Sequence, residues 1–262
     1  MPESVSYLWG FSMTTTELNK PTKTTSGHKS SRVEVIDALR GLCVCLMVAH
    51  HLLYNLVVFL GAPRWFFHNP VFNIIVPFFA GMFMFLAGVS SRFSSSNIKR
   101  GLKVLLIACG VTAVTYFVID MPIWFGILHF LGFSMLFYGL THKFWLLLPK
   151  SIAPLIFITL FLVSNYITTH VEIYSYVPWA LGLGPPGGRF LHSYDFYPVL
   201  PWIFVFLLGT CAGDPIREKK LPSRFYSMKV PFFPRVGTRA LLIYILHQPI
   251  LYGLTMLILL LM

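Results

Sequence analysis

Apolar residues gather into seven runs along the chain, each close to the roughly 20 residues with which a helix crosses a bilayer. The alternation of polar and apolar residues at a period of two, typical of a membrane β-barrel, is absent from these runs. Backbone groups in lipid must bond within their own segment, so we interpret the runs as helices. The sequence therefore predicts an all-α, polytopic membrane bundle of about seven transmembrane helices: Val35–Leu60, Val71–Ser90, Lys103–Ile119, Ile123–Leu140, Ile152–Thr169, Tyr197–Ala212 and Ala240–Met262.

The composition agrees with a protein surrounded by lipid. Of the 262 residues, 56% are hydrophobic and 11% are charged, whereas soluble domains average about 45–50% and about 25%. This excludes a water-soluble globular enzyme, and it excludes disorder because so much apolar surface has to be buried. The four cysteines lie in predicted helices, and neither a Cys-x-x-Cys pair nor a His-Glu-x-x-His sequence occurs. We therefore expect no disulfide and no metal site.

Three segments differ from the apolar runs. Residues 1–30 are rich in Thr, Ser, Lys and Pro, which indicates a flexible tail in which Met1 or Met13 is the start. The connection Glu172–Phe196 contains a glycine-rich turn without the Lys-Ser/Thr ending of a phosphate-binding loop. The connection Asp214–Arg239 is basic. The chain thus divides into the tail (1–30), a membrane domain (31–255) and the end of the last helix (256–262).

The formal net charge of +11 follows from where the basic residues lie. Seventeen of the twenty Lys and Arg lie in the tail or at alternate connections between the predicted helices, and the intervening connections hold only Arg64 and Arg189. Cytoplasmic loops of membrane proteins are enriched in Lys and Arg. The pattern therefore predicts a cytoplasmic N-terminus and an outer C-terminus, and we expect no nucleic-acid partner.

The first predicted helix carries ionisable groups, which cost about 2.5–3.5 kcal/mol each inside a bilayer and so require a reason. Arg40 and His51 are eleven residues apart, close to three helical turns, so they share a face. Asp37 and Asn55 lie on roughly the same face, whereas His50 points about a quarter-turn away. We expect this stripe to face protein or water instead of lipid.

Two interpretations of the stripe remain open. In the simpler one, Asp37 and Arg40 form an interfacial pair and the histidines only bond neighbouring helices. In the other, His51, about 24 Å from the start of the helix and toward the outer half of the membrane, takes a proton from an acceptor arriving from outside. Further ionisable residues are expected near the outer side, where they suggest a shared cavity: His68, Asp120, His129, His192, Asp195 and His247.

Several segments resemble the catalytic-domain family of heparan-α-glucosaminide N-acetyltransferase. In the order of the chain they are Asp37–Gly41, His51–Leu56, Gly126–Gly132, Asp195–Trp202 and Leu246–Pro249. Together they extend over roughly residues 31–255. The spacing of the arginine and histidine in the first helix is also similar to that of a wider superfamily of membrane acyltransferases.

The resemblance implies an integral membrane acyltransferase. An acyl group, in the simplest case acetyl, would pass from cytosolic acyl-CoA to an amino sugar or other glycan on the opposite side. Acyl-CoA is then a co-substrate, and no tightly bound cofactor is expected. The implied partners are the lipid bilayer, acyl-CoA and the glycan acceptor. The protein is also compatible with a homo-oligomer, and the expected location is the plasma membrane of a prokaryote.

The resemblance also implies roles for individual residues. His51 and His68 are alternative catalytic bases, because some relatives place the histidine on the first helix and others just after it. It leaves open whether transfer is direct or proceeds through an acyl-histidine. The residues expected to bind or orient substrates are Asp37, Arg40, Asn55, His129, Asp195 and His247. The residues expected to meet the CoA phosphates are Lys219, Lys220, Arg235 and Arg239, unless these serve topology alone.

Two other functions fit parts of the pattern. Charged groups and histidines on one helix stripe suit a proton-coupled small-molecule transporter, although no internal repeat is visible. A catalytically inactive membrane subunit of the same fold is the second alternative, because Asn55 stands where many bacterial relatives carry aspartate.

Overall fold

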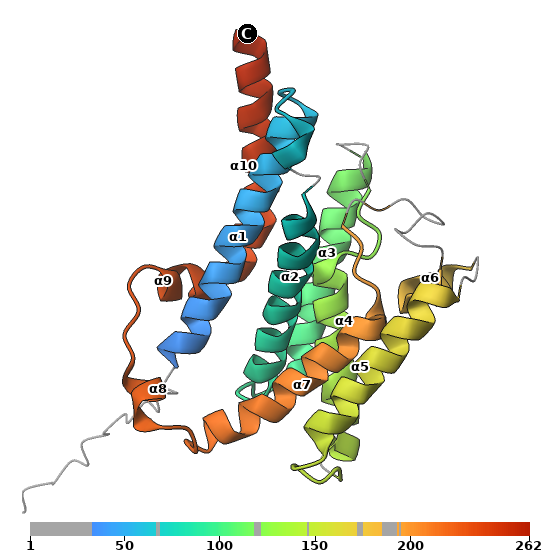
Figure 1. Ribbon diagram of the computed structural model, residues 1–262, viewed down its shortest axis with the longest axis vertical. Helices are drawn as coiled ribbons and strands as arrows, with labels where there is room; N and C mark the ends of the chain where they lie inside the picture. Colours follow the sequence, from blue (N-terminus) through green and yellow to red (C-terminus); the bar gives the residue numbers. More distant parts are fainter. Residues whose placement is uncertain are drawn as a thin grey trace, which may run out of the picture. The chain divides into compact units, whose positions relative to one another are not determined.

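The computed structural model describes residues 33–66, 69–117, 122–145, 147–171, 175–184, 193 and 195–262, and Val33–Met262 forms one compact unit. The described residues are helical and contain no strand, which confirms the all-α prediction (Figure 1). The long helices are α1 (Glu34–Val58), α2 (Pro70–Ser91), α3 (Asn97–Phe117), α4 (Ile127–Trp145), α5 (Ala153–His170), α7 (Val199–Arg217) and α10 (Ala240–Leu261). The short ones are η1 (Arg64–Phe66), α6 (Tyr176–Leu181), α8 (Ser223–Ser227) and α9 (Phe233–Thr238).

Each of the seven predicted runs coincides with a long helix. Within the described residues, six of these helices are long and apolar enough to cross a membrane. The exception is α4, whose 19 residues include His129, His142 and Lys143. The helix boundaries differ from the predicted ones where polar residues extend a helix beyond its apolar run. Thus α3 begins at Asn97, six residues before the predicted start at Lys103.

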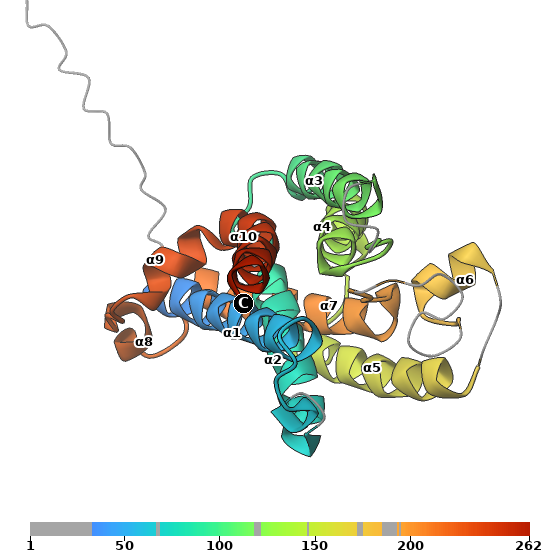
Figure 2. The same ribbon diagram turned by 90° about the horizontal axis from the view of Figure 1, so that it is seen from above.

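The long helices pack in a connected series. α2 packs against α7, which also contacts α5 and α4, and α3 packs along α4. On the other side of α2, α1 contacts α2, α10 and the short helix α9 (Figure 2). The interior of the series contains large side chains with almost no exposure, among them Met84 of α2, Phe130 of α4 and Phe206 of α7. The faces turned away from the neighbouring helices are rich in exposed Leu, Ile and Phe, as expected of surfaces in contact with lipid.

Glycines allow α2 and α7 to approach closely. A methyl group added at Gly88 would overlap the carbonyl oxygen of Phe206, and one added at Gly209 would overlap the carbonyl oxygen of Phe85. Small residues at such crossings let helix backbones come together in membranes, where dispersion contacts replace the hydrophobic effect as the force for association. This crossing fixes the position of α2, which forms one wall of the cavity described below.

The basic connections meet at one end of the bundle. Arg92, which follows α2, forms an ion pair with Asp214 of α7 and donates a 2.7 Å hydrogen bond to the Tyr138 hydroxyl of α4. Arg40 of α1 donates to the Ser90 hydroxyl near the end of α2, so α1 begins at this same end. This is the end for which the sequence predicts a cytoplasmic position.

A second ion-pair network lies at the same end. Glu218, just after α7, accepts hydrogen bonds from Lys220 at 2.6 Å and from Lys150 at 3.1 Å. The two ammonium groups, Lys220 more than Lys150, lower the pKa of the Glu218 carboxyl to about 2. The connection between α4 and α5 is therefore tied to the end of α7.

We predict that Gly209→Ala destabilises the protein because the added methyl group separates α2 from α7. Overpacking of this kind costs about 1–3 kcal/mol, which corresponds to a fall in Tm of roughly 2–10 °C. The matched control is Gly110→Ala in α3, where an added methyl group meets no atom within 4 Å. Thermal unfolding in the same detergent should show the Gly110→Ala Tm unchanged or slightly raised, since alanine favours a helix. Equal Tm values for both variants would contradict the close crossing.

Candidate functional site

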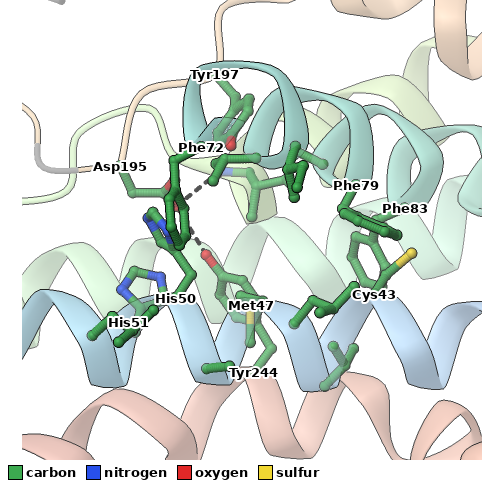
Figure 3. A pocket seen from close by; sticks show the side chains of 18 of the residues that line it. Cys43, Met47, His50, His51, Phe72, Phe79, Phe83, Asp195, Tyr197 and Tyr244 are labelled. Carbon is green, nitrogen blue, oxygen red and sulfur yellow. Dashed lines mark hydrogen bonds between the residues drawn. The ribbon is translucent and has the colours of Figure 1, made fainter. Parts of the chain in front are cut away.

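A cavity of about 550 Å³ lies between α1, α2, the start of α4, the segment before α7 and α10. Its size is typical of sites for small molecules and cofactors. Most of its lining is apolar, and its polar side chains come from three separate parts of the chain. These side chains are His50, His51, Asp195, Tyr197 and Tyr244 (Figure 3).

Three imidazoles lie close together beside this cavity. The ring of His51 lies 4.9 Å from that of His247 of α10 and 5.5 Å from that of His50, measured between ring centroids. Both His50 and His51 line the cavity although they are adjacent in the sequence, because the cavity extends around more than one side of α1. The structure thus brings His51 and His247 together, and it adds His50, which the helix geometry had placed on another face.

Hydrogen bonding determines which nitrogen of His247 carries a proton. Nδ1 of His247 lies 2.6 Å from the carbonyl oxygen of Tyr244. A carbonyl only accepts hydrogen bonds, so Nδ1 carries the proton and the neutral ring keeps a lone pair on Nε2. Nε2 is buried and has no hydrogen-bond partner in the described part of the chain, and the side chain as a whole is only 8% exposed. His247 therefore offers a buried acceptor nitrogen on a ring that lies close to His51.

Asp195 holds the polar end of the cavity together. Its Oδ2 accepts a 2.9 Å hydrogen bond from the Tyr244 hydroxyl and a 3.2 Å hydrogen bond from the Ile127 amide. Ile127 is the first residue of α4, so the carboxylate caps this helix and lies at the positive end of its dipole. Burial raises the pKa of the Asp195 carboxyl, against the effect of these two hydrogen bonds. Burial and the nearby Asp195 also raise the pKa of the Tyr197 hydroxyl.

Asp37 and Arg40 form an ion pair of 2.6 Å near the opposite end of α1, and Arg40 also donates to Ser90. At 1.5 Å per residue, Arg40 lies about 16 Å along the helix axis from His51. Neither residue lines the cavity. The two halves of the predicted stripe therefore have different surroundings, one interfacial and one beside the cavity.

Two other expected residues make contacts elsewhere. Asn55 is fully buried, and its amide donates to the Thr255 hydroxyl of α10 at 3.4 Å. His129 accepts from the Gly126 amide through Nδ1, and its Nε2 lies 3.1 Å from the Thr112 hydroxyl of α3. Neither Asn55 nor His129 lines the cavity, and both connect helices.

The remaining candidates are dispersed. Three of the residues expected near the outer side lie outside the described residues: His68, Asp120 and His192. Lys220 lines a second cavity of about 570 Å³ at the basic end, between α2, α4, α5 and α7, whereas Lys219 lines neither cavity. The two cavities share no lining residue. Arg235 lies in α9 and Arg239 follows it, and α9 packs directly on α1.

Sequence reasoning missed Tyr244 and Tyr197. Tyr244 lies three residues before His247, so the two share a face of α10, and this spacing was a usable signal. Tyr197 lies two residues after Asp195 in a segment without regular structure, where spacing gives no direction for a side chain.

The fold and the cavity together define a polytopic helical membrane protein with a partly buried group of imidazole, carboxyl and phenol side chains. Residues 32–249 match the family model described as heparan-alpha-glucosaminide N-acetyltransferase, catalytic. The chain belongs to this family, and membership supports a membrane-bound acetyltransferase in general terms. No curated protein and no solved structure matches the chain.

We predict that Asp195 contributes a pH-dependent part of the stability. Because its pKa is raised in the folded state, the folded protein binds this proton more tightly than the unfolded chain. The resulting stabilisation is full below the ordinary aspartate pKa of about 3.9 and is lost as the pH rises through the folded-state value. The Tm of the wild-type protein minus that of Asp195→Asn should therefore fall as the pH rises from 4 to 7.

A second variant tests the raised pKa of Asp195 by raising it further. Tyr244→Phe removes a hydrogen bond that lowers the Asp195 pKa, so the loss of Tm with rising pH should become steeper than in the wild-type protein. Thermal unfolding of the three proteins in one buffer series measures both effects. A wild-type curve that runs parallel to that of Asp195→Asn would contradict the assignment.

Proposed function

We propose that the protein transfers an acyl group, in the simplest case acetyl, from cytosolic acyl-CoA to an amino sugar or other glycan on the outer side of the membrane. The observation that carries the proposal is the cavity lined by His51, whose ring lies 4.9 Å from that of His247, in a chain of the acetyltransferase family. The proposal places the protein in a prokaryotic plasma membrane, and a homo-oligomer remains a prediction.

His51 acts as the general base in this scheme. The amine or hydroxyl of the acceptor attacks the thioester carbonyl while an imidazole nitrogen of His51 takes its proton. The tetrahedral oxyanion then collapses, the carbon–sulfur bond breaks, and the CoA thiolate leaves and recovers a proton from the imidazolium. His247 acts as a positioning residue, because its ring lies 4.9 Å from the His51 ring and is itself held by the Tyr244 carbonyl.

Asp195 and the tyrosines support the acceptor side of the site. Asp195, Tyr197 and Tyr244 line the same cavity as His51 and present oxygen atoms suited to the hydroxyl groups of a sugar. The Asp195–Tyr244 hydrogen bond holds the part of α10 whose carbonyl fixes the ring of His247. The other expected residues do not line this cavity, so we assign positioning roles to them: Asp37, Arg40, Asn55 and His129.

We predict that His51→Ala lowers transfer by about 10²–10⁴-fold, the usual contribution of a general base. The assay measures transfer from labelled acetyl-CoA by purified protein in nanodiscs, with a panel of amino sugars. His142→Ala at the exposed end of α4 is the matched control and should retain wild-type activity. Full activity in His51→Ala together with loss in His68→Ala would assign the base to His68. Full activity in both would remove a histidine base from the mechanism.

The same purified protein distinguishes direct transfer from an acyl-histidine intermediate. Incubation with labelled acetyl-CoA but no acceptor, followed by rapid denaturation at neutral pH, should leave the protein unlabelled if transfer is direct. Label on a histidine peptide would instead show a covalent intermediate.

We assign the CoA phosphates to Arg235 and Arg239, because they lie on or next to α9, which packs on the beginning of α1 at Asp37 and Gly41. Lys220 is already paired with Glu218 at the second cavity, and Lys219 lines neither cavity. Arg239→Gln should raise the KM for acetyl-CoA about tenfold or more, since a hydrogen bond to a charged group contributes about 1.5–3 kcal/mol. Lys143→Gln at the same basic end is the control. Equal KM values in both variants would limit the arginines to a topological role.

A further inference from the structure

The cavity has two chemically different ends. At the histidine end lie His50, His51, Asp195, Tyr197 and Tyr244. The lining at the other end, which we call the apolar arm, comes from α1 and α2 and consists of Cys43, Val44, Leu46, Met47, Phe79, Ala80 and Phe83. Figure 3 shows His51 and Asp195 on one side of the cavity and Cys43, Phe79 and Phe83 on the other. From His51 to Cys43 the arm extends about 12 Å along α1.

The cavity opens to the side of the bundle. Ala49 of α1 and Ile75 of α2 both line it and are both exposed. Each lies inside a helix that is long and apolar enough to cross the membrane, so in a membrane-spanning bundle we expect their exposed surfaces to face lipid. A molecule dissolved in the bilayer can therefore enter between α1 and α2 without passing through water.

The cavity changes from polar to apolar in the same direction as the outer leaflet of the bilayer. With the N-terminus in the cytoplasm, His51 lies in the outer half of α1 and Cys43 lies just inward of its middle. A lipid of the outer leaflet has its head group toward the outer end of α1 and its hydrocarbon chain toward the middle of the bilayer, which is the same order as in the cavity. We propose that the acceptor is carried by a lipid of the outer leaflet, with its head group at the histidine end and its chain in the apolar arm. This inference rests on the proposed transferase function.

Two other occupants of the apolar arm fit less well. The pantetheine of CoA carries two amide groups, and burying an amide without a hydrogen-bond partner is unfavourable. The described residues that line the arm offer no amide, hydroxyl or charged side chain. The acyl chain of a long-chain donor has suitable chemistry, but it would be attached to a CoA that arrives from the cytoplasm, whereas the side opening faces lipid.

A photoreactive probe tests where the chain lies without requiring turnover. The probe is a decyl glucosaminide with a diazirine at the end of the chain, added to the protein in phosphatidylcholine nanodiscs and mapped by mass spectrometry after illumination. We expect adducts in the peptides that contain Cys43–Met47 and Phe79–Phe83, reduced severalfold by excess unlabelled decyl glucosaminide. Adducts spread over lipid-facing positions of α3 and α5, with no competition, would overturn the proposal.

Variants at the side opening provide the matched comparison. Ala49→Trp should reduce labelling of the apolar arm at least fivefold, because the indole fills the opening. Ala113→Trp places the same side chain on the exposed surface of α3 and should leave labelling unchanged. Equal labelling in both variants would overturn the side entry. A decanoyl-CoA with a terminal diazirine tests the other source, and labelling of the arm by this probe alone would assign the chain to the donor and overturn the proposal.

Transfer measurements separate this inference from the proposed function. With acetyl-CoA as donor, kcat/KM for decyl glucosaminide should exceed that for ethyl glucosaminide at least tenfold in the wild-type protein. His51→Ala should lower transfer by about 10²–10⁴-fold but retain labelling of the apolar arm. Labelling without transfer from any donor would support the lipid site and overturn the transferase proposal. Equal transfer to both acceptors, without specific labelling, would support the transferase and overturn the lipid-borne acceptor.

Discussion

Asp195 accepts hydrogen bonds from the Tyr244 hydroxyl and the Ile127 amide, and through them it joins α10 and the start of α4 to the segment before α7. These three parts of the chain are far apart in sequence and form one wall of the cavity. The same contacts reach His247, because the backbone carbonyl of Tyr244 fixes the ring through Nδ1. A buried carboxylate is unfavourable unless it is hydrogen-bonded, so the position of Asp195 and the arrangement of the histidine end depend on each other.

The cavity remains open because its two long walls have other partners. α2 is held by its glycine crossing with α7, and α1 is held by a similar close approach to α9, where Gly41 and Gly237 face each other. α1 also packs along α10. Each wall thus obtains most of its packing on the side away from the cavity, which leaves apolar side chains of α1 and α2 facing a space between them.

The fold was largely predictable from the sequence, because in lipid the length of an apolar run and the satisfaction of the backbone almost determine a helix. All seven predicted runs are long helices, and the all-α class is confirmed. The ends were less predictable where polar residues such as Asn97 continue a helix into the interface. The short helices α8 and α9 lie in a connection interpreted only as basic, since hydropathy carries no signal for a single turn packed on another helix.

The candidate site was predictable only in part, because a sequence pattern gives the angle of a residue around its helix but not its distance from residues on other helices. Helical spacing placed Arg40 and His51 on one face of α1, but it records the angle around the axis and not the 16 Å or so between them. The contact between His51 and His247 joins the first and last long helices, and no pattern within either helix encodes that pairing. His50 illustrates the opposite error, because a cavity wide enough to extend around α1 receives side chains from more than one face.

The apolar character of the cavity also bears on the chemistry proposed for it. A thioester held near a general base is open to attack by water as well as by the acceptor, so an acyltransferase must favour the acceptor. Water finds few hydrogen-bond partners in a space lined by Phe79, Phe83 and Val44. For a hydrocarbon chain, burial in this space is favourable by about 0.8 kcal/mol of free energy for each CH₂ group. A chain anchored in the apolar arm would place its polar head group next to His51 and keep it there at high local concentration. The side opening, the apolar arm and the paired imidazoles then serve one purpose, which is to select a membrane-borne nucleophile over water.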